Sequence, residues 1–147
     1  MLDAKYAFAQ GNLEECIQIF DKILGMEPDN LIALFTRGTA KFRNSDHSGA
    51  IGDFTKYIEQ NATNEKVFCS RGNVYLALNK TDEAMADFER SIELNPQYPT
   101  AYFSRSELFL LLNEPEHAED DKILAEQLQR QIAQAYYETQ GIMFQNF

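Results

Sequence analysis

The sequence predicts an all-α protein built from stacked helix–turn–helix hairpins. Apolar residues recur at helical spacing, as Ala84, Phe88 and Ile92 do at intervals of four residues. The whole pattern returns every 34 residues, and turn-forming residues separate the expected helices at the same period. A period of this kind is typical of solenoids, whose units bury their apolar faces by stacking on one another.

The 34-residue step is visible in several columns, a column being the set of positions one period apart. The columns are Phe20, Phe54 and Phe88; Cys16, Ala50, Ala84 and Ala118; Gly38, Gly72 and Ser106; Arg37, Arg71 and Arg105; and Asp53, Asp87 and Asp121. Small residues are expected where two helices cross closely, and the phenylalanines fill the space beside them.

In chain order, we expect one domain over residues 1–147, composed of a partial repeat 1–30, repeats 31–64 and 65–98, and a degenerate repeat 99–132. The first helix, about Leu2 to Gln10, is short. Pro28 closes the first repeat, and Asn95-Pro96 ends the third. Pro99 and Pro115 suit the first turn of a helix, where a missing N–H does no harm.

The end of the chain leaves two readings open. Between Glu116 and Gln140 no glycine or proline interrupts the sequence, so one long helix is consistent with it. The alternative is a break near Gln129 to Ile132, followed by a capping helix over residues 133–147. We expect the capping helix, because solenoids need a polar-faced terminal element.

These columns resemble the tetratricopeptide repeat (TPR) family. Residues Glu65 to Tyr98 carry its pattern in Phe68, Gly72, Tyr75, Ala84, Phe88 and Pro96, and depart from it at Ser91. The resemblance extends over nearly the whole chain. It implies a right-handed superhelix that acts as a non-enzymatic protein-interaction scaffold, with a partner peptide or helix in the concave groove formed by the first helices.

Composition excludes several other functions. The 13 basic and 23 acidic side chains give a net charge of −10, which disfavours binding to nucleic acid. The sequence shows neither a signal peptide nor a membrane-spanning stretch, so we expect a cytoplasmic protein. Cys16 and Cys69 suggest neither a disulfide framework nor a metal site.

The groove columns that the resemblance implies contain both aromatic and polar residues, with Leu76, Ala77 and Ser104 among them. Aromatic anchors often dominate binding energy, although such rings can also serve only to pack adjacent helices. The residues that we predict to contact a partner are Phe35, Thr39, Phe42, Lys66, Cys69, Asn73, Phe103 and Glu107.

One TPR subclass binds the acidic C-terminal tails of heat-shock chaperones through a clamp of lysine, asparagine and arginine residues. In this chain the corresponding columns of repeats two to four hold Phe35, Thr39, Ser70, Thr100 and Ser104. The clamp is absent, so acidic chaperone tails are not the expected ligand.

We find no constellation of catalytic or metal-binding residues. His47 and His117 fall in different repeats without a nucleophile or carboxylate pair beside them. Acidic residues crowd the start of one helix from Glu114 to Asp121, where the helix dipole accounts for them. We therefore expect no enzyme activity, cofactor or metal.

The apolar tail from Gly141 to Phe147 supports an alternative function. It could lie against repeat four, begin a further helix or enter the groove of a neighbour. In the last case the protein is a homo-oligomer that associates through its terminal repeat and tail.

Overall fold

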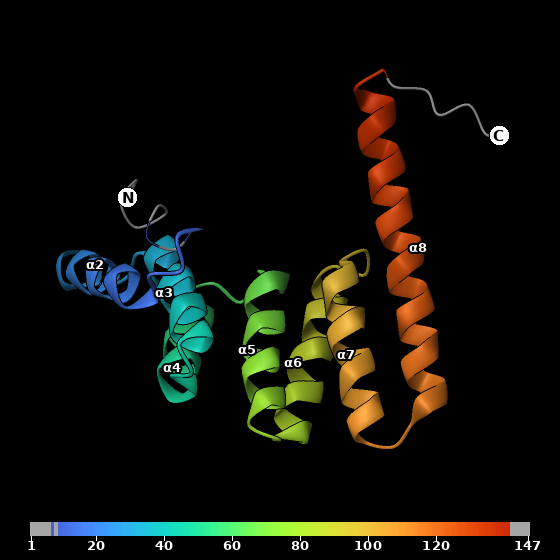
Figure 1. Ribbon diagram of the computed structural model, residues 1–147, viewed down its shortest axis with the longest axis horizontal. Coiled ribbons are helices and arrows are strands. Elements are labelled where there is room, and N and C mark those ends of the chain that lie inside the picture. The colour runs from blue at the N-terminus through green and yellow to red at the C-terminus, as the bar shows by residue number, and fades with distance from the viewer. Residues whose placement is uncertain (1–6, 8, 142–147) are drawn as a thin grey trace.

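The computed structural model describes residue 7 and residues 9–141. The described residues form a row of helices without a strand (Figure 1), which confirms the all-α class. The helices are α2 (Leu13–Met26), α3 (Leu31–Arg43), α4 (His47–Gln60), α5 (Glu65–Ala77), α6 (Thr81–Leu94), α7 (Pro99–Leu111) and α8 (Pro115–Thr139). The predicted helix from Leu2 to Gln10 lies mostly outside the described residues.

Consecutive helices pack into hairpins, namely α3 with α4, α5 with α6 and α7 with α8. Each hairpin also packs on the next, because α4 contacts α5 and α6 contacts α7. The first helices contact one another as well, α3 with α5 and α5 with α7. They therefore form a continuous layer on which a binding surface can be built.

Local sequence signals set the helix ends. The side-chain oxygens of Asn30 and Asn64 accept hydrogen bonds from the backbone N–H groups of Ala33 (2.9 Å) and Lys66 (3.0 Å). The turns inside the three hairpins each contain a left-handed residue, with φ of 64° at Ser45, 60° at Asn79 and 66° at Asn113. Asparagine tolerates this conformation better than most residues.

The two central hairpins are held together by a ring packed on a glycine. A Cβ atom at Gly38 would lie 2.8 Å from Cε1 of Phe54, and one at Gly72 would lie 2.6 Å from Cε1 of Phe88. Both rings are fully buried. No larger residue fits at either glycine without displacing the ring, so the two helices approach closely at these points.

The fourth repeat changes both partners of this contact together. Ser106 occupies the glycine column, and Lys122, which is exposed, occupies the phenylalanine column. A serine Cβ is tolerated here because no buried ring from α8 occupies the column opposite it.

Buried ion pairs join the two helices of every complete hairpin. The Arg37, Arg71 and Arg105 guanidinium groups each donate two hydrogen bonds of 2.6–2.8 Å to an aspartate of the following helix, namely Asp53, Asp87 and Asp121. These hydrogen bonds raise the pKa of each arginine above its ordinary value, while burial opposes the rise.

The same arginines link neighbouring hairpins. Arg37 also donates to Asp21 on α2 (2.7 Å), and Arg71 donates to Thr55 on α4 (3.1 Å). The Arg71 guanidinium carbon lies 5.8 Å from the centres of the Phe68 and Tyr75 rings, close enough for cation–π attraction. Each arginine therefore stabilises stacking as well as its own hairpin.

The predicted separation of a capping helix is wrong for the described part of the chain. α8 continues without interruption from Pro115 to Thr139. In α4 and α6 the helix ends at Asn61 and Asn95, both with φ of −146°. Gln129 occupies this column in α8, and glutamine is a good helix former. Residues 142–147 lie outside the described residues.

We expect Gly72→Ala to destabilise the protein by about 1–3 kcal/mol, because its Cβ would overlap the Phe88 ring. Gly52→Ala in α4 is the matched control, since a Cβ at Gly52 meets no atom within 4 Å. The control should stabilise the helix by about 0.5–1 kcal/mol. Urea unfolding followed by circular dichroism measures both, and equal effects at the two sites would contradict the close-contact explanation.

We expect Asp87→Asn to lower the free energy of unfolding by roughly 2–4 kcal/mol, because it leaves the half-buried Arg71 without its counter-charge. The control is Glu93→Gln, which removes the exposed ion pair between Arg90 and Glu93 and should cost less than about 0.5 kcal/mol. Equal losses in urea unfolding would show that the buried pair contributes nothing special.

Candidate functional site

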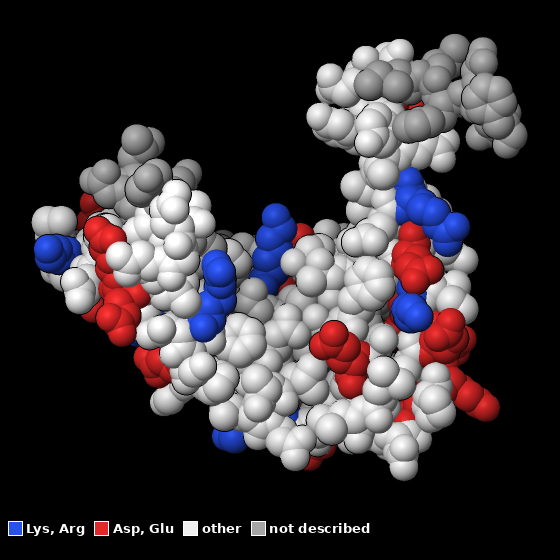
Figure 2. Space-filling model, in the orientation of Figure 1, with Lys and Arg blue, Asp and Glu red and all other residues white. Residues whose placement is uncertain are grey.

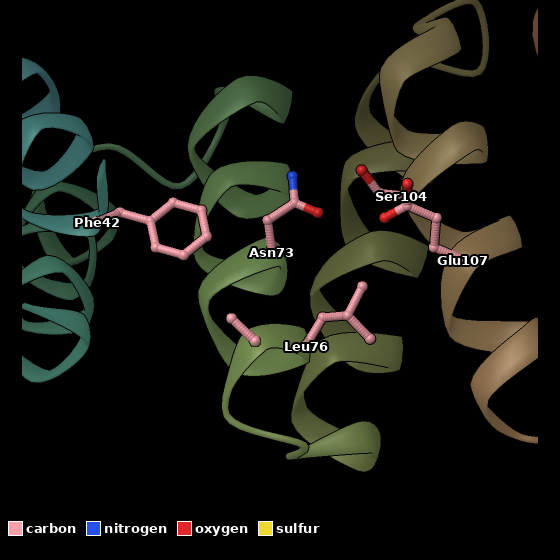
Figure 3. Close-up of a pocket in the computed structure, with 6 residues that line it drawn as sticks. Phe42, Asn73, Leu76, Ser104 and Glu107 are labelled. Carbon is pink, nitrogen blue, oxygen red and sulfur yellow. The ribbon is translucent and has the colours of Figure 1, made fainter. Parts of the chain in front are cut away.

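A cavity of about 510 Å³ lies on the layer of first helices. It is lined by Phe42 from α3, Asn73, Leu76 and Ala77 from α5, and Ser104 and Glu107 from α7. Figure 3 shows the Phe42 ring pointing from α3 toward Asn73, with Ser104 and Glu107 on the opposite wall. Three consecutive repeats thus contribute side chains to one concave site.

The cavity combines apolar walls with a small number of polar groups. Phe42 and Leu76 are partly buried and present apolar surface, whereas Glu107 is exposed and carries a negative charge. The Asn73 amide nitrogen lies 3.9 Å from the Cys69 sulfur, a weak contact. Its amide can therefore hydrogen-bond to a peptide backbone. A site of this composition suits an extended peptide or a helix with apolar side chains.

The structure brings together three of the eight predicted contact residues, Phe42, Asn73 and Glu107. Lys66 is exposed near the start of α5 but does not line the cavity. The Thr39 hydroxyl is partly buried and donates to the Phe35 carbonyl oxygen (2.8 Å), so its donor is already used within α3.

Two of the predicted anchors serve partly as packing residues. The Phe35 ring lies with its centre 5.9 Å from that of Phe54 and packs against the core of the first two hairpins. Phe103 packs against a cluster that contains Ala125 and Leu128 of α8. Both rings are only partly buried, and neither lines the cavity.

The prediction that Cys69 contacts a partner needs correction, because its side chain is only 1% exposed. α7 covers it, and its sulfur lies 3.8 Å from the Ser104 hydroxyl oxygen. Burial raises the pKa of the Cys69 thiol to about 11. The thiol is therefore protonated at neutral pH and is a packing group beneath the cavity.

The arginine–aspartate pairs were not predicted from the sequence, although the signal was present. Arginine and aspartate each recur every 34 residues and are always 16 residues apart. Such a pair of columns indicates two side chains that meet in every hairpin. They are structural residues, and they leave the cavity to other columns.

The part of the chain that the structure describes contains no group of three or more histidine, cysteine, aspartate or glutamate side chains placed to hold a metal ion. None of its helices is long and apolar enough to cross a membrane.

Two sequence models of the tetratricopeptide repeat match this chain, one over residues 2–65 and the other over residues 65–98. The second match has the same limits as the third predicted repeat. The chain belongs to the tetratricopeptide repeat family. No curated protein matches the TPR chain in sequence.

Solved structures share the TPR fold of this chain. "Crystal structure of MamA" has a TM-score of 0.78 at 19% identity and covers 95% of this chain and 85% of its own. "MamA 41-end from Desulfovibrio magneticus RS-1" has a TM-score of 0.80 at 12% identity and covers 87% and 72%. At these identities the likeness concerns the fold alone, and it confirms the predicted TPR-like superhelix.

The buried Cys69 thiol predicts a pH dependence of stability. Its folded-state pKa of about 11 exceeds the ordinary value of 9.0, so the folded state binds the proton more tightly. The resulting stabilisation is complete below pH 9 and is lost as the pH rises toward 11.

We expect the wild-type chain to lose roughly 2 kcal/mol more than Cys69→Ala between neutral pH and about pH 10.5. Urea unfolding of both chains across this range gives the difference, in which the tyrosines and lysines common to both chains cancel. Parallel curves for the two chains would show that Cys69 is not buried as described.

Proposed function

We propose that this TPR protein is a non-enzymatic scaffold that binds a peptide or helix of a protein partner at the cavity between Phe42, Asn73 and Glu107. The observation that supports it is the convergence of these residues from three repeats on one concave site. Membership of the TPR family agrees with such a role.

In the proposed complex, Phe42 and Leu76 contact an apolar side chain of the partner. The Asn73 amide hydrogen-bonds to its backbone, and the Glu107 carboxylate favours a basic residue nearby. A basic partner also suits a chain whose net charge is −10. An acidic chaperone tail does not, since no clamp of lysine and asparagine residues faces the cavity.

Two further parts of the proposal concern chemistry and location. The cavity offers no activated nucleophile, because the nearby Cys69 thiol is buried and has a raised pKa. Both cysteines are free and buried, which suits a reducing compartment such as the cytoplasm.

Self-association is a second candidate function, supported by a different observation. The second half of α8 exposes Ile132, Tyr136 and Tyr137 to solvent. These residues lie on the terminal repeat and outside the cavity, so self-association and groove binding do not exclude each other.

The groove proposal can be tested with a random peptide library displayed on phage and selected on the immobilised full chain. Synthetic versions of the selected peptides are then titrated by calorimetry. We expect Phe42→Ala and Asn73→Ala each to weaken binding by about tenfold or more, and Glu107→Gln to reduce the preference for basic peptides.

The matched control is Glu59→Gln, which removes an exposed carboxylate on α4 that does not line the cavity. It should leave affinity unchanged. An acidic C-terminal peptide serves as a negative probe. Tight, salt-sensitive binding of that probe, or peptide affinity insensitive to Phe42→Ala and Asn73→Ala, would exclude the proposed site.

A further inference from the structure

The second half of α8 has no neighbour along the face that it buries lower down. α8 has 25 residues, whereas its partner α7 has 13. The face that packs on α7 contains Ala118, Asp121, Ala125 and Leu128. At helical spacing the same face continues with Ile132 and Tyr136, which are 52% and 62% exposed. In Figure 1 this half of α8 projects well beyond the other helices.

The repeat register indicates that these residue types are normally buried. Tyr136 belongs to the column of Leu34, Phe68 and Tyr102, which are 1%, 7% and 7% exposed. Ala135 belongs to the column of Ala33, Val67 and Ala101, all of them 0% exposed. In the earlier repeats a packed helix covers this pair, but nothing within the described residues covers it on α8.

Charge is distributed unevenly along α8. From Pro115 to Glu126 there are six charged residues, five of them acidic, whereas Arg130 is the one charged residue from Gln127 to Tyr137. Helical spacing places Arg130 opposite the face that carries Ile132 and Tyr136. Figure 2 shows charged side chains over the lower part of α8 and few on its projecting part.

This distribution points to a second copy of the chain as the occupant. Two molecules with a net charge of −10 repel each other over most of their surfaces. The projecting half of α8 is a surface where they can meet without bringing like charges together. A strongly charged partner would find no counter-charge on this face.

Building on self-association, and independently of the groove, we infer that the projecting halves of α8 from two copies pair antiparallel about a two-fold axis near Gln134. This arrangement places Ile132 of each copy opposite Tyr136 of the other. Ala133 and Ala135 beside the apolar face allow the helices to approach closely. The Tyr136 and Tyr137 rings, 5.7 Å apart and edge-on, add aromatic surface at the contact.

The antiparallel geometry predicts a specific pattern of rescue. Sedimentation velocity of the full chain should show a concentration-dependent dimer. Ile132→Lys and Tyr136→Glu should each raise the dimer dissociation constant by at least about tenfold, since each places a charge in an apolar contact. A one-to-one mixture of these two variants should recover the dimer, because the introduced lysine and glutamate then lie opposite each other while the second contact stays native.

Gln134→Lys is the matched control, since it adds a charge to the same segment on the face opposite Ile132 and Tyr136. It should leave the dimer intact, and circular dichroism should show that all variants keep their helix content. Phe42→Ala should leave the dimer unchanged, and Ile132→Lys should leave peptide affinity unchanged, so failure of either proposal is separable from the other.

Several results would overturn the inference. A monomer at every concentration, or a dimer insensitive to Ile132→Lys and Tyr136→Glu, excludes this contact. A dimer that is lost on removal of residues 142–147 but retained in the α8 variants assigns the contact to the tail. Failure of the mixed variants to associate excludes the antiparallel pairing.

Discussion

The contact between a phenylalanine ring and a glycine sets the distance between the helices of the central hairpins. The Phe54 ring lies on Gly38, and the Phe88 ring lies on Gly72, with no space for a Cβ atom at either glycine. Since protein interiors are close-packed, a larger residue at either glycine would separate the helices and alter every contact along them. The fourth repeat shows the converse, because it lacks the buried ring at Lys122 and carries Ser106 in the glycine column.

The close approach also makes the ion-pair ladder feasible. With the helices held at this distance, Arg71 reaches Asp87 within its own hairpin and Thr55 on the preceding one. One side chain therefore connects three helices. Residues that recur in every repeat are used in this way to build the scaffold, and recognition falls to residues that the repeats do not share, such as Phe42 and Glu107.

The two surfaces proposed for binding differ in chemistry. The cavity mixes the Phe42 ring with the Asn73 amide and the Glu107 carboxylate, which suits a peptide with both apolar and basic side chains. The projecting half of α8 is apolar and nearly uncharged, which suits a surface like itself. Because the two surfaces share no residue, a dimer joined through α8 keeps both cavities free and carries two copies of the site.

The sequence by itself determined the repeat period, the all-α class, most helix ends and the columns that face the concave layer. These features follow from local signals, such as the caps at Asn30 and Asn64, and from a spacing that repeats them. Only the tertiary structure decided which of those columns remain exposed. Cys69 is buried because α7 packs over it, and Phe35 and Phe103 turn partly into the core. α8 is continuous because nothing at Gln129 forces the helix to end. Burial of a side chain depends on helices distant in sequence, which no local pattern specifies.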